Sequence, residues 1–151
     1  MTIKTKQSKK PESDEQAAEL TPCDKNRILV VDDEKVILDL FWRLLSLRLP
    51  KCRIDIAVNG AEAVEQFRAA HHSVIMMDLR MPVMDGQQAF LEIQSLCREE
   101  NVEMPSVVFC TGYDPPGMIQ RLVAGNTKHC ILHKPVPDNI LLETLTMRLG
   151  A

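Results

Sequence analysis

Short apolar runs alternate with longer amphipathic segments along most of the chain. Five runs of five or six residues, mostly aliphatic and β-branched, are typical of buried strands. They cover residues 27–31, 53–58, 73–78, 106–111 and 129–134. Between and after these runs, apolar residues recur at intervals of three and four, which is the period of an amphipathic helix. The predicted helices span residues 36–49, 61–70, 87–100, 115–125 and 139–149.

Residues at the ends of these segments support the same division. Pro50 ends the first predicted helix, Asn59 is placed to cap the second, and Asp138 is placed to cap the last. Alternating strands and helices favour a parallel sheet with helices on both faces. We therefore predict an α/β fold, a doubly wound parallel sheet of five strands with five helices.

The first 25 residues differ in composition from the rest of the chain. Residues 1–25 carry five lysines and five acidic residues and almost no large apolar side chains. Such a segment buries too little apolar surface to offset the entropy of ordering. We predict a disordered tail over 1–25 and one folded domain over 26–150.

Charge and cysteine content narrow the class of protein. The formal net charge is −3, which argues against a nucleic-acid-binding surface. No apolar run approaches the roughly 20 residues of a membrane span, and no signal peptide opens the sequence. The five cysteines are scattered, and Cys110 and Cys130 sit in apolar runs as core residues would. We expect a cytoplasmic protein with reduced thiols, without nucleic-acid or membrane partners.

Polar residues with reactive side chains stand where four of the predicted strands end. Asp32 and Asp33 follow the first strand, Asp78 ends the third, Thr111 ends the fourth and Lys134 ends the fifth. An open α/β sheet keeps its ligand site at the carboxyl ends of its strands. The sequence therefore predicts that these five side chains share one site.

The chemistry of this set favours phosphoryl transfer to an aspartate. Three carboxylates in one cleft repel each other, so a hard cation such as Mg²⁺ and the ammonium of Lys134 are needed as compensation. The hydroxyl of Thr111 can donate to a phosphoryl oxygen. Asp78 is then the nucleophile, and the cations neutralise charge on the transferred group. Taken singly, each residue also has an ordinary structural role, such as a helix cap for Asp33 or a turn for Asp78.

Several motifs resemble the receiver domain of two-component response regulators. The resemblance runs from about Arg27 to Leu149 and is carried by VVDDE (30–34), NGAEAV (59–64), MMDLRMPVMDG (76–86), Thr111 and HKP (133–135). It implies the flavodoxin-like receiver fold and transfer of a phosphoryl group to Asp78 from a sensor histidine kinase or a histidine phosphotransfer protein. A receiver is not a conventional enzyme, although slow self-dephosphorylation is expected of one.

The resemblance also implies a role for each site residue. The implied Mg²⁺ ligands are Asp32 (through water), Asp33, Asp78 and the backbone carbonyl of Arg80. Thr111 and Lys134 would contact the phosphoryl group, and a cis peptide bond would precede Pro135. Residues 115–149 contain the surface that receivers remodel, so a downstream protein or a second copy of the chain is expected to bind there.

Three positions depart from the common receiver pattern or extend it. Receivers commonly carry an aromatic residue where this chain has Ile131, so we expect the signal to rely on backbone and loop movement instead. Arg80 and Tyr113 stand two residues beyond Asp78 and Thr111. Two bulky side chains there favour a long-lived phosphoaspartate.

Two other functions are alternatives to this interpretation. A hydrolase of the haloacid-dehalogenase kind would place its nucleophile after the first strand and a second acid two residues later. Here Asp78 follows the third predicted strand and position 80 is arginine, which disfavours that class. A receiver-fold scaffold that binds a partner without being phosphorylated remains the alternative.

Overall fold

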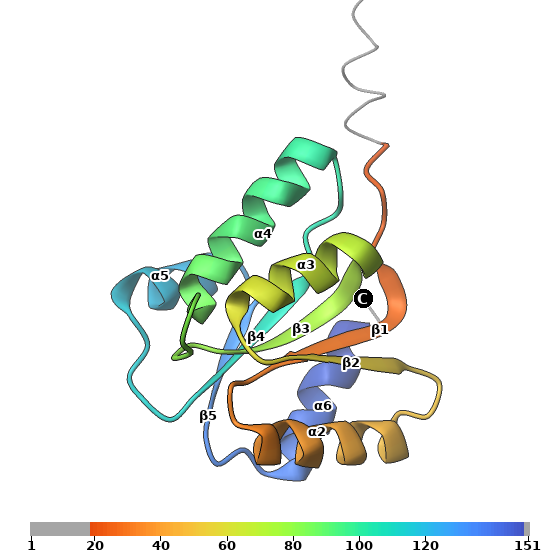
Figure 1. The fold of residues 1–151 in the computed structure, drawn as a ribbon, viewed down its shortest axis with the longest axis vertical. Helices are drawn as coiled ribbons and strands as arrows, with labels where there is room; N and C mark the ends of the chain where they lie inside the picture. The colour runs from red at the N-terminus through yellow and green to blue at the C-terminus, as the bar shows by residue number, and fades with distance from the viewer. Residues whose placement is uncertain (1–18, 150–151) are drawn as a thin grey trace, which may run out of the picture.

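The computed structural model describes residues 19–149 and contains one parallel sheet. Its five strands lie in the order β2-β1-β3-β4-β5 (Figure 1). The strands are β1 (Asp24–Val31), β2 (Arg53–Ala57), β3 (His72–Asp78), β4 (Ser106–Thr111) and β5 (Cys130–His133). The order changes direction between β1 and β3, which creates the crevice where doubly wound sheets bind ligands.

Five helices cover the two faces of the sheet. They are α2 (Lys35–Arg48), α3 (Gly60–Ala70), α4 (Gly86–Glu100), α5 (Gly117–Gly125) and α6 (Asp138–Leu149). The apolar side chains of α3, α4 and α5 pack on one face, and those of α2 and α6 pack on the other. None of the helices within residues 19–149 is long and apolar enough to cross a membrane.

The predicted α/β architecture is confirmed, with small shifts at element ends. Asn59 caps α3 as predicted, because its side-chain oxygen accepts a hydrogen bond from the Glu62 N–H at 2.8 Å. Asp138 is the first residue of α6 rather than the residue before it. All five cysteines are free thiols, and burial raises the pKa of Cys110 to about 12, which agrees with a core role.

Ordered structure begins before the predicted boundary at residue 26. Thr21 forms a parallel bridge with Val102, and β1 starts at Asp24. The backbone N–H of Cys23 donates to the Glu103 carboxylate at 3.0 Å, and its thiol donates to the Glu103 carbonyl. The loop before β4 therefore supplies the hydrogen-bond partners for this segment. Residues 1–18 of the predicted tail lie outside the described residues.

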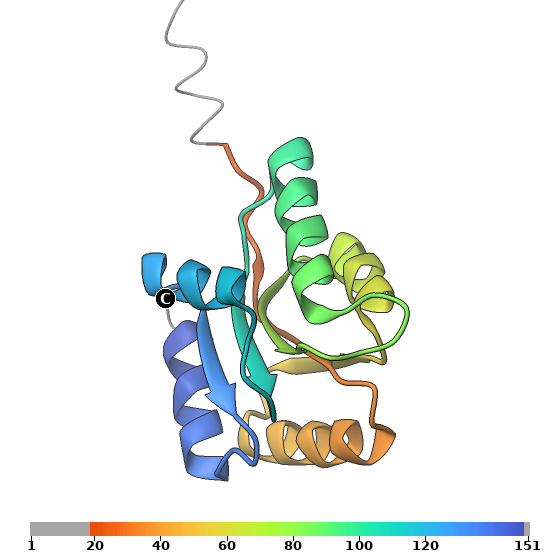
Figure 2. The same cartoon turned by 90° about the vertical axis from the view of Figure 1, so that its left-hand side faces the viewer.

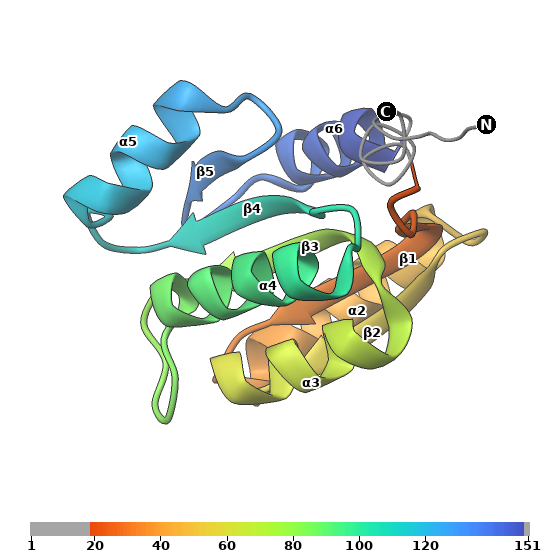
Figure 3. The ribbon, with the colours of Figure 1, turned by 90° about the horizontal axis from the view of Figure 1, so that it is seen from above.

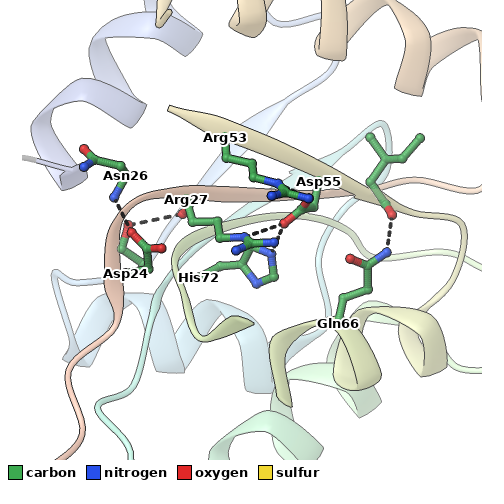
Figure 4. A network of polar contacts seen from close by, with 9 residues as sticks. Asp24, Asn26, Arg27, Arg53, Asp55, Gln66 and His72 are labelled. Carbon is green, nitrogen blue, oxygen red and sulfur yellow. Dashed lines mark hydrogen bonds and ion pairs between the residues drawn. The ribbon is translucent and has the colours of Figure 1, made fainter. Parts of the chain in front are cut away.

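A polar network joins β1, β2 and β3 near their amino ends (Figure 4). The Asp55 carboxylate lies 2.8 Å from the Arg27 Nε and 2.8 Å from the Nε2 of the buried His72. Burial alone would raise the pKa of Asp55, but the hydrogen bonds from Arg27 and His72 lower it overall. Burial lowers the pKa of His72, against the pull of Asp55. The network ties the three strands together on the side of the sheet away from the residues at their carboxyl ends.

We expect His129 to make the fold sensitive to mild acid. The Val107 N–H donates to the His129 Nδ1 at 3.0 Å, so the ring is neutral. Burial, with Lys128 and Arg148 nearby, lowers the pKa of His129 to about 4 from an ordinary value of 6.5. Between these values the unfolded chain binds a proton that the folded chain does not, so stability falls as the pH is lowered. The loss amounts to about 3 kcal/mol by pH 4.

Urea unfolding of the wild type and a His129→Asn variant at pH 4 to 7.5 checks this expectation. Asparagine offers an acceptor oxygen to the Val107 N–H but does not titrate. The variant should lose less stability than the wild type between pH 6.5 and pH 4. Equal losses in the two proteins would show that His129 is not responsible.

Candidate functional site

The carboxyl ends of four adjacent strands bring the predicted residues to one edge of the sheet. All five strands are parallel, so their carboxyl ends face the same side of the molecule (Figure 3). Asp32 and Asp33 follow β1, Asp78 ends β3, Thr111 ends β4, and Lys134 follows β5. The outer strand β2 contributes no reactive side chain, because it lies on the far side of β1 from this crevice.

Three carboxylates meet at this edge. One oxygen from each of Asp32, Asp33 and Asp78 lies within 4.8 Å of the others. Asp32 and Asp78 are buried, whereas Asp33 is exposed. Carboxylate oxygens at this spacing are the hard ligands that Mg²⁺ takes in proteins. The three aspartates therefore fit the acidic pocket in which receivers hold this ion.

Lys134 supplies a positive charge that partly compensates these carboxylates. Its Nζ lies 2.7 Å from the Asp32 Oδ2 and 3.6 Å from the Asp78 Oδ2. Burial alone would lower the pKa of Lys134, but the hydrogen bond to Asp32 and the charges of Asp32 and Asp78 raise it overall. The lysine is therefore cationic and bridges two of the three carboxylates.

The pKa of Asp78 is raised despite this compensation. Burial raises its pKa, and repulsion from Asp32 and Asp33 adds to the effect. Attraction to Lys134 and a hydrogen bond from the Arg80 backbone N–H act in the opposite direction without cancelling it. A further cation at the site would stabilise the ionised carboxylate, and the ionised form is the one that can act as a nucleophile.

The loop after β3 is held close to Asp78 by the start of α4. The Gly86 N–H donates to the Leu79 carbonyl at 3.0 Å, and Asp85 caps α4 through the Gln88 N–H at 2.8 Å. At the tip of the loop, the Met84 N–H donates to the Pro82 carbonyl around Val83, whose φ is 70°. This i to i+2 bond is a γ-turn, a compact geometry that fixes the loop beside the carboxylate.

Thr111 lies at the same edge but is engaged with its own loop. Its side chain is buried, and its hydroxyl accepts a hydrogen bond from the Tyr113 N–H at 3.1 Å. The hydroxyl also lies 3.3 Å from the Tyr113 carbonyl oxygen, to which it donates. The Lys134 N–H donates to the Thr111 carbonyl at 2.9 Å, and a cis peptide bond links Lys134 to Pro135. Thr111 is thus placed at the strand end as predicted.

A cleft of about 510 Å³ opens above these residues. Its lining is Asp33, Glu34, Asp78, Arg80, Gly112, Tyr113 and Lys134. Across it, the guanidinium carbon of Arg80 sits 4.0 Å from the centre of the Tyr113 ring. Sequence reasoning placed both residues near the acceptor but missed their contact, since nothing in residue spacing reports on a stack between two loops. It also missed Glu34, which lines the cleft beside the acid pair.

Comparison with known proteins agrees with this geometry. The sequence model of the response regulator receiver domain matches residues 28–146. The chain belongs to the response regulator receiver domain family. The receiver sequence match includes every residue of the acidic edge described above, and it spans all five strands of the sheet apart from the start of β1.

Curated relatives match this chain over a small part of their own length. The protein-glutamate methylesterase/protein-glutamine glutaminase of Aliivibrio fischeri is 41% identical over 71 residues, which are 47% of this chain and 19% of that protein. Two-component system protein A of Emericella nidulans is 34% identical over 128 residues, which are 83% of this chain and 18% of that protein. The chain therefore spans less than a fifth of the length of either relative.

Solved receiver structures share the fold. The receiver domain protein of Methanospirillum hungatei, described as CheY-like, is 23% identical with a TM-score of 0.68, over 83% of this chain and 94% of that chain. The receiver domain of an HD domain-containing protein of Pseudomonas fluorescens is 23% identical with a TM-score of 0.69, over 84% and 96% of the two chains. The flavodoxin-like receiver fold predicted from the sequence is confirmed. A receiver domain is not itself a conventional enzyme, and the esterase and glutaminase names belong to the longer relative.

Proposed function

We propose that this receiver accepts a phosphoryl group on Asp78 from a phosphohistidine of a sensor histidine kinase or a histidine phosphotransfer protein. A carboxylate oxygen of Asp78 attacks phosphorus, a P–O bond forms, the P–N bond breaks, and the imidazole leaves and takes up a proton. Membership of the receiver family and the names of relatives such as Two-component system protein A support this class of partner.

One observation carries the proposal. The Nζ of the half-buried Lys134 lies 2.7 Å from an oxygen of Asp32 and 3.6 Å from an oxygen of Asp78. One oxygen from each of these two carboxylates and one from Asp33 lie within 4.8 Å of one another. A structural ion pair needs one acid for one base, and here three acids converge where one would suffice. The excess negative charge fits a site that binds a cation and then a phosphoryl group.

Mg²⁺ would be held by Asp33 and Asp78, by Asp32 through water and by the backbone carbonyl of Arg80. When bound, it would neutralise charge on the oxygens of the transferred group. Lys134 would pair with one phosphoryl oxygen and so remain charged while the Asp78 carboxylate is consumed. Thr111 would donate its hydroxyl hydrogen to another phosphoryl oxygen.

We propose that the output is contact with a protein through residues 115–149. In this region α5, β5 and α6 lie together at one side of the molecule (Figure 2). Met118 and Leu122 of α5 are half-buried against the core, whereas Ile140 and Met147 of α6 are exposed. These exposed apolar side chains offer surface to a downstream protein or a second copy of the chain.

A scaffold that is never phosphorylated is the second candidate. It is favoured by Ile131, which is half-buried against the core in β5 and offers no ring for the usual switch. The intact acidic edge favours the phosphorylated receiver instead, because a scaffold has no use for three converging carboxylates.

Phosphorylation by acetyl phosphate separates the two candidates. With Mg²⁺ present, we expect intact mass spectrometry of the wild type to show the addition of one phosphoryl group. The addition should disappear in Asp78→Asn, which keeps the shape of the side chain but loses its nucleophile. It should also disappear when EDTA removes the metal, because the carboxylates and the phosphoryl donor then repel each other.

An Asp39→Asn variant provides the matched control. Asp39 is an exposed acid on α2, outside the acidic edge, so the same substitution there should leave the mass shift unchanged. Following the phosphorylated mass after the donor is removed gives the lifetime of the phosphoaspartate. If neither acetyl phosphate nor a phosphorylated phosphotransfer protein modified the wild type, the scaffold would replace the phosphorylated receiver as the proposed function.

A further inference from the structure

Tyr113 is an exposed aromatic residue at the mouth of the cleft. The residue is 57% exposed, and its ring centre lies 4.0 Å from the guanidinium carbon of Arg80. A guanidinium within about 6 Å of a ring centre is attracted by the electrons of the ring face. The contact joins the loop after β3 to the loop after β4, and it is a cation–π stack between two otherwise separate segments of the site.

Both partners of this stack are tied through their backbones to the residues that would meet a phosphoryl group. Arg80 follows Asp78 by two residues, and its backbone lowers the pKa of the Asp78 carboxylate. The Tyr113 N–H and carbonyl both hydrogen-bond the Thr111 hydroxyl, at 3.1 and 3.3 Å. The stack therefore closes a chain of contacts that runs from the acceptor, over the cleft, to the hydroxyl on the next strand.

A phosphoryl group on Asp78 would compete with this chain of contacts at two points. A threonine hydroxyl has a single hydrogen to donate. If Thr111 donates it to a phosphoryl oxygen, the hydrogen bond to the Tyr113 carbonyl is lost. The Arg80 guanidinium, for its part, gains a nearby phosphoryl anion, and charge-assisted hydrogen bonds to phosphate are stronger than an exposed cation–π contact.

We infer that the Arg80–Tyr113 stack is closed before phosphorylation and opens after it, so that Tyr113 is the aromatic residue that reports the state of the site. This inference rests on the proposed function of Asp78. It gives the chain a switching residue although the fifth strand carries Ile131, because the ring is supplied by the loop after β4 instead.

The position of Tyr113 indicates what the switch would change. Tyr113 is exposed and stands four residues before the start of α5, so release of its ring changes the surface next to the 115–149 region. Loss of one such exposed contact changes the ratio of the open to the closed state of the stack by roughly 2- to 5-fold. A partner that binds the released ring would increase this ratio further.

Fluorine NMR tests the inference directly, because Tyr113 is the single tyrosine of the sequence. Protein labelled with 3-fluorotyrosine would give one resonance from this ring. We expect the resonance to move when Mg²⁺ and acetyl phosphate are added. In an Arg80→Ala variant, which lacks the stack, the unphosphorylated resonance should already lie near the phosphorylated position, and phosphorylation should move it by less than half as much.

Intact mass measured on the same samples distinguishes failure of Asp78 phosphorylation from failure of the stack to open. Phosphorylated wild-type protein with an unmoved resonance would overturn the inference and leave the acceptor role of Asp78 standing. An equal movement in Arg80→Ala would also overturn it, since the phosphoryl charge alone would then explain the shift. If neither acetyl phosphate nor a phosphorylated phosphotransfer protein added a phosphoryl group, the proposed function would fail and the inference would fail with it.

Discussion

A Gly86→Ala variant is expected to lose about 3 kcal/mol of stability, which is toward the upper end of the cost of overpacking. Asp78 of this variant should also be phosphorylated more slowly than in the wild type. A Cβ at this position would be built against the carbonyl oxygen of Asp78 and the Cα of Leu79. Both neighbours are backbone atoms, so neither can turn aside as a flexible side chain would. Relief of the clash must therefore move the start of α4 away from β3 or move the acceptor itself.

Chemical denaturation of the wild type and the variant measures the loss, and acetyl phosphate labelling measures the effect on Asp78. Gly125→Ala is the matched control, because a Cβ at Gly125 would meet no atom within 4 Å. That variant should be at least as stable as the wild type, since alanine favours the helix end more than glycine does. A Gly86→Ala protein of wild-type stability would show that the loop after β3 is more adaptable than its hydrogen bonds suggest.

The fold and the acidic edge could be predicted because both are encoded in short stretches of sequence. A buried strand such as 73–78 is recognisable from its own side chains, and the acid or base that follows a strand is fixed by chain order alone. Parallel strands then bring these residues together without further information, which is why Asp32, Asp78 and Lys134 meet as expected.

Contacts between distant side chains and loops could not be predicted in the same way. The segment before β1 is ordered because Glu103, 80 residues away, accepts hydrogen bonds from Cys23. The stack of Arg80 on Tyr113 depends on how two loops approach each other over the cleft. Composition alone predicts that the segment before β1 belongs to a disordered tail, because composition reports only the apolar surface that a segment can bury by itself. It does not report the hydrogen-bond partners that another segment supplies.

The departure at Ile131 shows how the two kinds of information combine. From the sequence, the missing aromatic residue suggested a signal carried by backbone and loops. The structure supplies a candidate for that movement in the loop after β4, where the Thr111 hydroxyl holds both backbone polar groups of Tyr113. A receiver can thus lose an aromatic residue in β5 and still keep a ring in contact with the site.

Lys134→Met is expected to slow phosphorylation of Asp78 by about two orders of magnitude, the usual cost of losing one group that stabilises transition-state charge. Methionine keeps most of the length of the side chain and removes the ammonium. The buried Asp32 then loses its 2.7 Å partner, and Asp78 loses the charge at 3.6 Å. Because Lys134 opposes the rise in the Asp78 pKa, that pKa should rise further in the variant.

The stability of the variant should therefore depend on pH and on Mg²⁺ more than that of the wild type. An acid whose pKa is raised by folding binds its proton more tightly in the folded chain, so stability is lost as the pH rises from 3.8 through the raised value. Lowering the pH or adding Mg²⁺ should each narrow the stability difference between Lys134→Met and the wild type, because each neutralises negative charge that the variant leaves uncompensated.

Initial rates of acetyl phosphate labelling and urea unfolding with and without Mg²⁺ measure both effects. Lys51→Met, an exposed lysine between α2 and β2, is the matched control and should behave as the wild type in both assays. A Lys134→Met protein that labelled at the wild-type rate would place the ammonium outside the transition state. Its contact with Asp32 would then be a purely structural ion pair, and compensation of the phosphoryl charge would fall to the metal and Thr111.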